Sequence, residues 1–137
     1  MRGVNHAGNF RELNVYKKAK QVSREVFELS KSFPKEEIYS LTDQIRRASR
    51  SVGAQIAEAW AKRRYEKHFI SKLSDADAEQ LETQHWVGEA CDCHYLNSKQ
   101  AEDLLGGLQQ IGRMLNSMME KSQLFCRADD PLPTTDD

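Results

Sequence analysis

The sequence contains few of the residues that organise small extracellular or β-rich proteins. It has three cysteines, three prolines and seven glycines in 137 residues. An odd number of cysteines forms no complete disulfide framework, so Cys91, Cys93 and Cys126 are expected to be free thiols in a reducing compartment. With 30% charged residues and 39% hydrophobic residues, this composition favours a helix-rich protein with an ordinary core.

Long apolar runs are also missing. No segment approaches the about 20 apolar residues that a membrane-spanning helix needs. The first ten residues, MRGVNHAGNF, lack the apolar part of a secretory signal. We therefore expect a cytoplasmic protein of one domain, without a membrane partner.

Motifs typical of catalysis do not occur in the sequence. The glycine patterns of phosphate loops, dinucleotide sites and nucleophile elbows are absent. Glu82 and His85 form one Glu-x-x-His motif, whereas a di-metal bundle site needs two. Cys91 and Cys93 point about 200° apart on a helix, so the pair is a poor zinc site. We expect no catalytic residues, no metal site, no cofactor and no enzyme activity; a metal enzyme built on Glu82 and His85 is the remote alternative.

Apolar residues spaced alternately by three and four predict four amphipathic helices. The predicted segments are about 10–31, a second that starts near Pro34 and continues past Ile56, about 65–95, and a fourth that an Asn97 or Ser98 cap begins. Four such helices with short connections predict an all-α, antiparallel, up-down-up-down four-helix bundle.

Three details qualify these helices. The second stripe begins with Ile38, and Gly53 marks a bend or a close helix contact within it. The third stripe is polar at its middle, at Gln80 and Thr83. Gly106 and Gly107 interrupt a strong heptad and are most simply a packing site. The predicted divisions are an extension over 1–9, the bundle over 10–122 and a flexible acidic tail over 123–137.

The near-zero net charge of −1 hides two opposed halves. Residues 1–72 contain sixteen Lys or Arg and eight Asp or Glu, whereas residues 73–137 contain four and thirteen. Within the basic half, residues 44–68 carry seven Lys or Arg and only two acids. Such a distribution suits pairing within the chain, pairing with another copy, or contact with an anion.

The basic segment supplies candidate nucleic-acid-binding residues. The arginine fork suits phosphate, and a cationic surface binds nucleic acid without reading its sequence. The candidates are Arg46, Arg47, Arg50, Lys62, Arg63 and Arg64. Two other interpretations remain open: a solvated helix face, or arginines that meet acids across a subunit contact.

The same helix supplies candidate interface residues. Small side chains form a second face beside the core stripe, and Trp60 projects from a helix whose core stripe is already complete. A helix that is apolar on two sides often contacts a second chain. The candidate oligomer interface comprises Arg50, Ala54, Ala57, Trp60 and Asp77.

Several segments, in order, resemble the bacterial four-helix-bundle family of 23S rRNA intervening-sequence proteins. They are FRELNVYKKA (10–19), FPKEEIYSLTDQIRRASRSV (33–52), QIAEAW (55–60), FISKLSDADAEQLETQ (69–84) and YLN (95–97). The resemblance covers about residues 10–120, and F-P-K-E-E-x-Y-x-L-T-x-Q-I-R-R-A is its most specific part.

The resemblance implies a small protein encoded in or near intervening sequences of ribosomal RNA genes that forms a ring-shaped homopentamer. The family is similar to the accessory variability determinant of diversity-generating retroelements, which implies RNA or DNA and a reverse transcriptase as partners. Arg46 and Arg47 match the family's paired arginines, and Glu58 matches the acidic residue of the family's Ile-Ala-Glu segment. This sequence has Gly53 where proline is common in the family, and Ala59 where the family has a glycine. Both differences alter the bend expected of the second helix.

We therefore expect a non-enzymatic, self-assembling scaffold or accessory protein that binds nucleic acid, a reverse-transcriptase-type partner, or both. The alternative is a structural homo-oligomer without a nucleic-acid role, in which the basic half of one subunit docks on the acidic half of the next.

Overall fold

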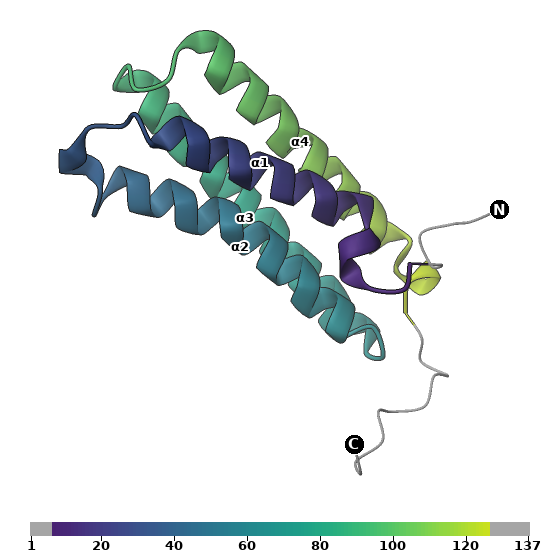
Figure 1. Ribbon diagram of the computed structural model, residues 1–137. Helices are drawn as coiled ribbons and strands as arrows, with labels where there is room; N and C mark the ends of the chain where they lie inside the picture. Colours follow the sequence, from purple (N-terminus) through teal and green to yellow (C-terminus); the bar gives the residue numbers. More distant parts are fainter. Residues whose placement is uncertain (1–6, 127–137) are drawn as a thin grey trace.

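The structure is a computed structural model that describes residues 7–126, and within this range the chain forms four long helices and three short 3-10 turns (Figure 1). The helices are α1 (Asn14–Ser30), α2 (Leu41–Ala61), α3 (Glu66–Asp92) and α4 (Ser98–Glu120), and the turns are η2 (Phe10–Glu12), η3 (Lys35–Glu37) and η4 (Ser122–Leu124). The described residues contain no strand. The predicted all-α class and the four helices are confirmed.

The helices pack around one core. α1 lies against α2 and α4, and α3 lies against the same two helices, so α1/α2 and α3/α4 form opposite sides of the molecule (Figure 1). All four helices contribute fully buried side chains, among them Val26, Ile45, Ile56, Leu73, Leu104, Leu108, Ile111 and Leu115. Within the described ranges, every helix is too short or too polar to cross a bilayer.

The first two helices begin later than periodicity predicts. Residues 10–12 form the turn η2, and extended Leu13 separates it from α1. The helix predicted to start near Pro34 is only the turn η3 there, and α2 begins at Leu41. Ile38 therefore lies outside the helix and is 48% exposed, so its assignment to the buried stripe is wrong.

Glu37 joins the two connections at one end of the bundle. Its carboxylate accepts hydrogen bonds from the Ser40 hydroxyl at 2.6 Å and the Leu41 N–H at 3.3 Å. The Tyr95 hydroxyl, in the α3–α4 connection, donates to it at 2.9 Å. These bonds, that of Ser40 first, lower the pKa of Glu37. The bond to Glu37 raises the pKa of Tyr95 to about 12, because a phenolate beside a carboxylate is unfavourable.

The polar centre of α3 is buried as predicted. Gln80 is 3% exposed and donates to the Asp77 carboxylate at 2.9 Å, and the Thr83 hydroxyl donates to the Glu79 carbonyl at 2.8 Å. Gly112 of α4 leaves space for this amide, because a Cβ there would lie 2.8 Å from Gln80 Nε2. Partners within α3 thus satisfy its buried polar groups.

Glycine allows close helix packing at one of the two adjacent positions. A Cβ on Gly107 would lie 2.9 Å from Cγ2 of Val22, so α1 and α4 approach closely there. At Gly106 no other described part of the chain lies within 4 Å of the same position, apart from its chain neighbours and the backbone of its own helix. The packing interpretation is confirmed for Gly107. The approach at Gly53 is looser, because a Cβ there would make an ordinary contact, 3.5 Å from Cε1 of Tyr16.

Both ends of α4 are well defined. The Asn97 side chain accepts the Gln100 N–H at 2.8 Å, and the Gln100 side chain accepts the Asn97 N–H at 2.9 Å, which confirms Asn97 as the cap. Beyond the helix, Phe125 is buried and stacks on Phe69, and the Ser122 hydroxyl donates to the Glu66 carboxylate.

The packed chain therefore extends at least to Phe125, three residues past the boundary predicted after residue 122. The rest of the predicted tail, 127–137, and most of the predicted extension, 1–6, lie outside the described residues.

Candidate nucleic-acid interface

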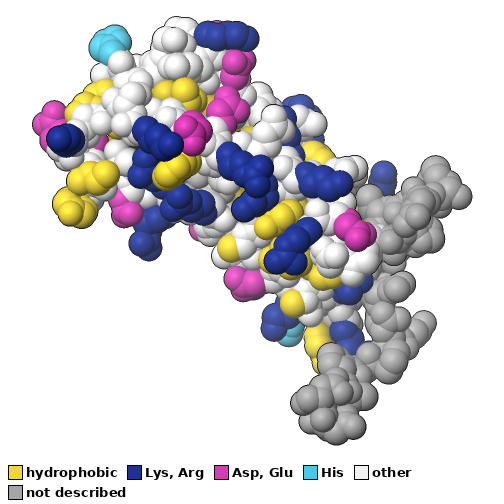
Figure 2. All heavy atoms as spheres, viewed as in Figure 1, with side chains coloured by type: hydrophobic (Ala, Val, Ile, Leu, Met, Phe, Trp, Pro, Cys, Tyr) yellow, Lys and Arg dark blue, Asp and Glu magenta, His cyan; other side chains and the backbone are white. Residues whose placement is uncertain are grey.

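The two sides of the bundle carry opposite charge. α1 and α2 contain seven Lys or Arg and four Asp or Glu, whereas α3 and α4 contain four and ten. Figure 2 shows Lys and Arg side chains spread over the face on which α1 and α2 lie. The sequence asymmetry between halves thus becomes a spatial asymmetry between sides.

Most cations on α1 and α2 have no acidic partner among the residues that the structure describes. Arg47 pairs with Asp43 at 4.0 Å, and both side chains are largely exposed, so this pair contributes little stability. The other six form no ion pair with any carboxylate of residues 7–126; they are Lys17, Lys18, Lys20, Arg24, Arg46 and Arg50. Their charge remains available to another molecule.

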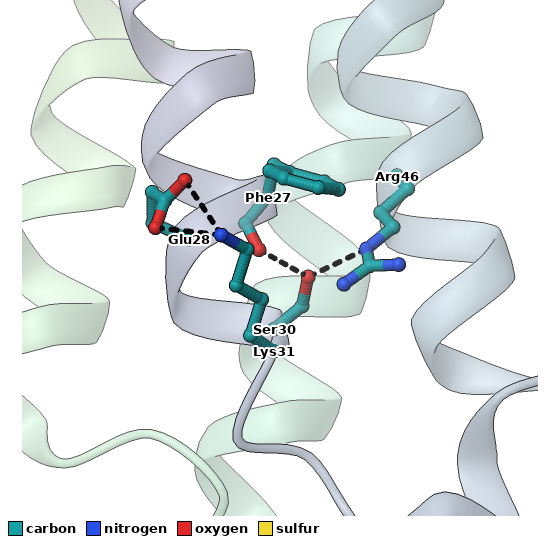
Figure 3. A network of polar contacts seen from close by, with 5 residues as sticks. All are labelled: Phe27, Glu28, Ser30, Lys31 and Arg46. Atoms are coloured by element: carbon teal, nitrogen blue, oxygen red, sulfur yellow. Dashed lines mark hydrogen bonds and ion pairs between the residues drawn. The ribbon is translucent and has the colours of Figure 1, made fainter.

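Arg46 is partly used inside the bundle. Its Nε donates to the Ser30 hydroxyl at 2.8 Å, and that hydroxyl donates to the Phe27 carbonyl at 3.0 Å (Figure 3). The guanidinium also lies 4.7 Å from the Phe27 ring centroid, a cation–π contact. Arg46 therefore joins α2 to the end of α1, which makes it a structural residue as well as a surface cation.

Arg47 and Arg50 are presented more openly. The Arg47 side chain is 76% exposed. Arg50 is exposed, its guanidinium lies 5.4 Å from the Phe27 ring centroid, and its side chain borders a groove between α1 and α2. These two arginines are the predicted residues that best fit a phosphate-binding surface.

The remaining predicted cations lie at the far end of α2. Lys62 is exposed, while Arg63 and Arg64 are half-buried. Arg63 donates to the Trp60 carbonyl at 2.9 Å and lies 3.6 Å from the Trp60 ring centroid. Since a helix rises 1.5 Å per residue, about 18 Å separates Lys62 from Arg50 along the axis. The predicted cations therefore form two groups.

Sequence reasoning missed the cations of α1. Arg11, Tyr16, Lys17, Lys20, Gln21 and Arg24 line a groove of about 630 Å³ along α1. A signal for them exists in the sequence, because Lys17, Lys20 and Arg24 recur at helical spacing opposite the apolar stripe. Residues 44–68 have the larger excess of cations over acids, seven against two, whereas α1 has four against two, so the basic segment of α2 dominates the charge pattern.

The predicted interface residues do not form one surface. Arg50, Ala54 and Ala57 border a groove of about 280 Å³ between α1 and α2. Trp60 lies near the end of α2 beneath Arg63. Asp77 lies on the opposite side of the molecule, in a groove of about 550 Å³ between α3 and α4.

Other candidate residues have local partners. Glu82 accepts a hydrogen bond from the Trp86 indole at 3.0 Å, and His85 packs on the Trp86 ring. No group of three or more His, Cys, Asp or Glu suited to a metal ion occurs between residues 7 and 126. Glu58 pairs with Lys72 at 2.8 Å across α2 and α3, and this contact raises the pKa of Lys72.

Thiols offer no further cluster in the described structure. Cys91, Cys93 and Cys126 are free, and Cys93 is exposed. Burial raises the pKa of the Cys126 thiol, so this sulfur is a weaker nucleophile than an ordinary cysteine.

The solved structures include one with a closely similar fold. It is the crystal structure at 1.70 Å resolution of a protein of unknown function from the S23 ribosomal protein family of Bacteroides thetaiotaomicron VPI-5482. The two chains are 24% identical with a TM-score of 0.68, and the match covers 77% of this chain and 98% of the other. At this identity the likeness establishes a shared fold.

No curated protein matches the sequence significantly. The profile of the family described as 23S rRNA-intervening sequence protein matches residues 11–117. That range includes all four helices apart from the last turn of α4. The chain therefore belongs to the family of 23S rRNA-intervening sequence proteins.

Proposed function

We propose that this protein is a non-enzymatic scaffold that assembles with itself and binds RNA or DNA through the exposed cations of α1 and α2. One observation carries the proposal. Six of the seven Lys and Arg side chains on these helices form no ion pair with a carboxylate of the described protomer. A row of such cations attracts a polyanion. Nucleic acid is such a polyanion, and arginine and lysine bind its backbone phosphates whatever the base sequence.

The proposal includes the arrangement implied by the resemblance. Up-down-up-down protomers would form a ring, a homopentamer in the cytoplasm, and each copy would add another basic face. Repeated weak contacts with one nucleic-acid molecule then add by avidity. An accessory role beside a reverse-transcriptase-type protein belongs to the same proposal, on the similarity to the accessory variability determinant of diversity-generating retroelements.

Removing three exposed cations tests nucleic-acid binding. The triple variant Lys17→Ala, Arg24→Ala and Arg47→Ala is expected to lose at least about tenfold in affinity for structured RNA and to have a shallower salt dependence. Fluorescence anisotropy titrations at about 50 mM and about 200 mM salt measure both quantities.

A second triple variant provides the control. Lys67→Ala, Lys99→Ala and Arg113→Ala remove the same charge from α3 and α4 and should leave the affinity nearly unchanged. Equal losses in the two triples would show only a net-charge effect. The proposal fails if the unaltered protein binds neither RNA nor DNA at low salt.

Opposite charge on opposite sides favours a second candidate, a structural homo-oligomer without a nucleic-acid role. The side formed by α3 and α4 has six more acids than bases, and the 54% exposed Leu81 borders its groove. Docking of the basic side of one protomer on the acidic side of the next is a heterologous contact, which closes into a ring when the rotation permits.

Light scattering coupled to gel filtration tests this second candidate. We expect Arg50→Glu to shift the molar mass toward the protomer, and Asp77→Lys added to it to restore the oligomer by reversing the pair. Higher salt should have the same dissociating effect as the single change. Lys99→Glu is the matched control. A mass that neither salt nor Arg50→Glu alters rules out assembly through this charge pairing.

A further inference from the structure

Two grooves on the basic side meet at Tyr16. The larger follows α1 and has four cations on its border, and the smaller lies between α1 and α2. Tyr16 and Lys20 border both grooves. An aromatic ring and a cation therefore lie on the border that the two grooves share.

The smaller groove has the size and lining of a site for one planar group. Small residues line it, namely Ala19, Gly53, Ala54 and Ala57, while Lys20 and Arg50 supply charge on its two helices. Its volume is about 280 Å³, below the roughly 300–1,000 Å³ of sites that enclose drug-sized ligands. A nucleobase with its phosphate at Lys20 or Arg50 suits these dimensions and charges.

The aromatic ring at the junction is already held in place. Tyr16 is half-buried and packs edge to face on Phe10, with ring centroids 5.0 Å apart. The Arg11 guanidinium covers Phe10 at 4.5 Å from its centroid. Among the described residues nothing accepts or donates a hydrogen bond at the Tyr16 hydroxyl. A fixed ring with an unpartnered polar group loses little entropy when a base stacks on it.

We propose that these two grooves bind single-stranded nucleic acid, with backbone phosphates along the larger groove and one unstacked base in the smaller groove against Tyr16. This inference rests on the proposed nucleic-acid function and specifies the form of strand. Bases in a duplex are paired and stacked, so they reach no concave site, whereas the bases of a single strand do. Only the cations would contact a duplex.

A larger side chain in the smaller groove tests base insertion without changing the charge of the protein. A labelled RNA of about 12 nucleotides, within the site sizes typical of single-strand binders, is compared with the duplex of the same sequence by anisotropy. Ala54→Leu adds bulk at the groove without changing charge, and we expect it to weaken single-strand binding at least fivefold while leaving duplex binding unchanged. The matched control is Ala78→Leu, an exposed alanine of α3.

The second part of the experiment removes the aromatic ring of Tyr16. Tyr16→Leu is expected to weaken single-strand binding about tenfold, as for loss of one stacked base, whereas Tyr16→Phe retains the ring and most of the affinity. Thermal unfolding of each variant identifies any loss caused by misfolding, and Ala54→Leu remains informative if Tyr16→Leu is unstable.

Each result has one interpretation. The inference is overturned, and the proposed function retained, if both groove variants bind single strands normally while the Lys17, Arg24 and Arg47 triple does not. Failure of every nucleic acid to bind overturns both. If Ala54→Leu changes the oligomeric mass but not the affinity, the inference is likewise overturned, and the groove holds a second copy of the chain instead.

Discussion

Replacing Phe125 with alanine is expected to lower the free energy of unfolding by about 3–5 kcal/mol, the range for a fully buried phenylalanine. Phe125 is 3% exposed, and its ring stacks on Phe69 with centroids 5.8 Å apart. Truncation leaves a cavity at the start of α3 and removes the contact that holds η4 against the bundle. Urea denaturation followed by circular dichroism measures the loss.

The adjacent residue provides the control for this change. Leu124 is 47% exposed, so Leu124→Ala should alter stability by no more than about 0.5 kcal/mol. A double-mutant cycle between Phe125→Ala and Phe69→Ala should give a coupling of about 0.5–1.5 kcal/mol for the aromatic pair. Equal, small effects at positions 124 and 125 would mean that the segment after α4 is not part of the core in solution.

Gly107→Leu is expected to destabilise the protein by about 3 kcal/mol, at the upper end of the usual cost of overpacking. A Cβ alone would lie 2.9 Å from Cγ2 of Val22. Val22 is buried and β-branched, so its rotamer has little freedom within a helix. α1 and α4 must separate to admit the larger side chain, which loses packing along both helices.

The neighbouring glycine distinguishes packing from helix propensity. Gly106 is exposed, and within residues 7–126 no side chain or backbone of another element lies within 4 Å of its ideal Cβ. Gly106→Leu should therefore stabilise the protein by roughly 0.5–1 kcal/mol, because leucine is a better helix former than glycine. Thermal and urea unfolding of the two variants should shift in opposite directions. Shifts of the same sign would contradict the close approach of α1 and α4 at Gly107.

Periodicity predicted the helices better than their beginnings. The stripes within α1 to α4 are buried, including polar Gln80 and Thr83 in α3. The start of α2 was wrong because Ile38 continues the three-four spacing into a segment that is not α-helical. The spacing of apolar residues does not distinguish a short 3-10 turn from an α-helix, because the two place side chains on one face at nearly the same intervals. The cap of α4 was narrowed to Asn97 or Ser98 because capping depends on local sequence, and the structure selects Asn97.

The candidate site was predicted in part. The exposure of Arg47 and Arg50 follows from their position opposite the apolar stripe. The position of Arg46 gives no indication of its bond to Ser30, sixteen residues earlier in the chain. The grooves beside Tyr16 require α1 and α2 to be neighbours with small residues between them, and no local pattern specifies which helices meet.

The sequence by itself determined four amphipathic helices, the start of α4 to within one residue and the segregation of charge, because each depends on spacing or composition along the chain. Only the tertiary structure decided that the cations of α1 join those of α2, that Gly107 brings α1 onto α4, and that Phe125 enters the core. These features depend on contacts between residues remote in sequence, and packing around a shared core selects them.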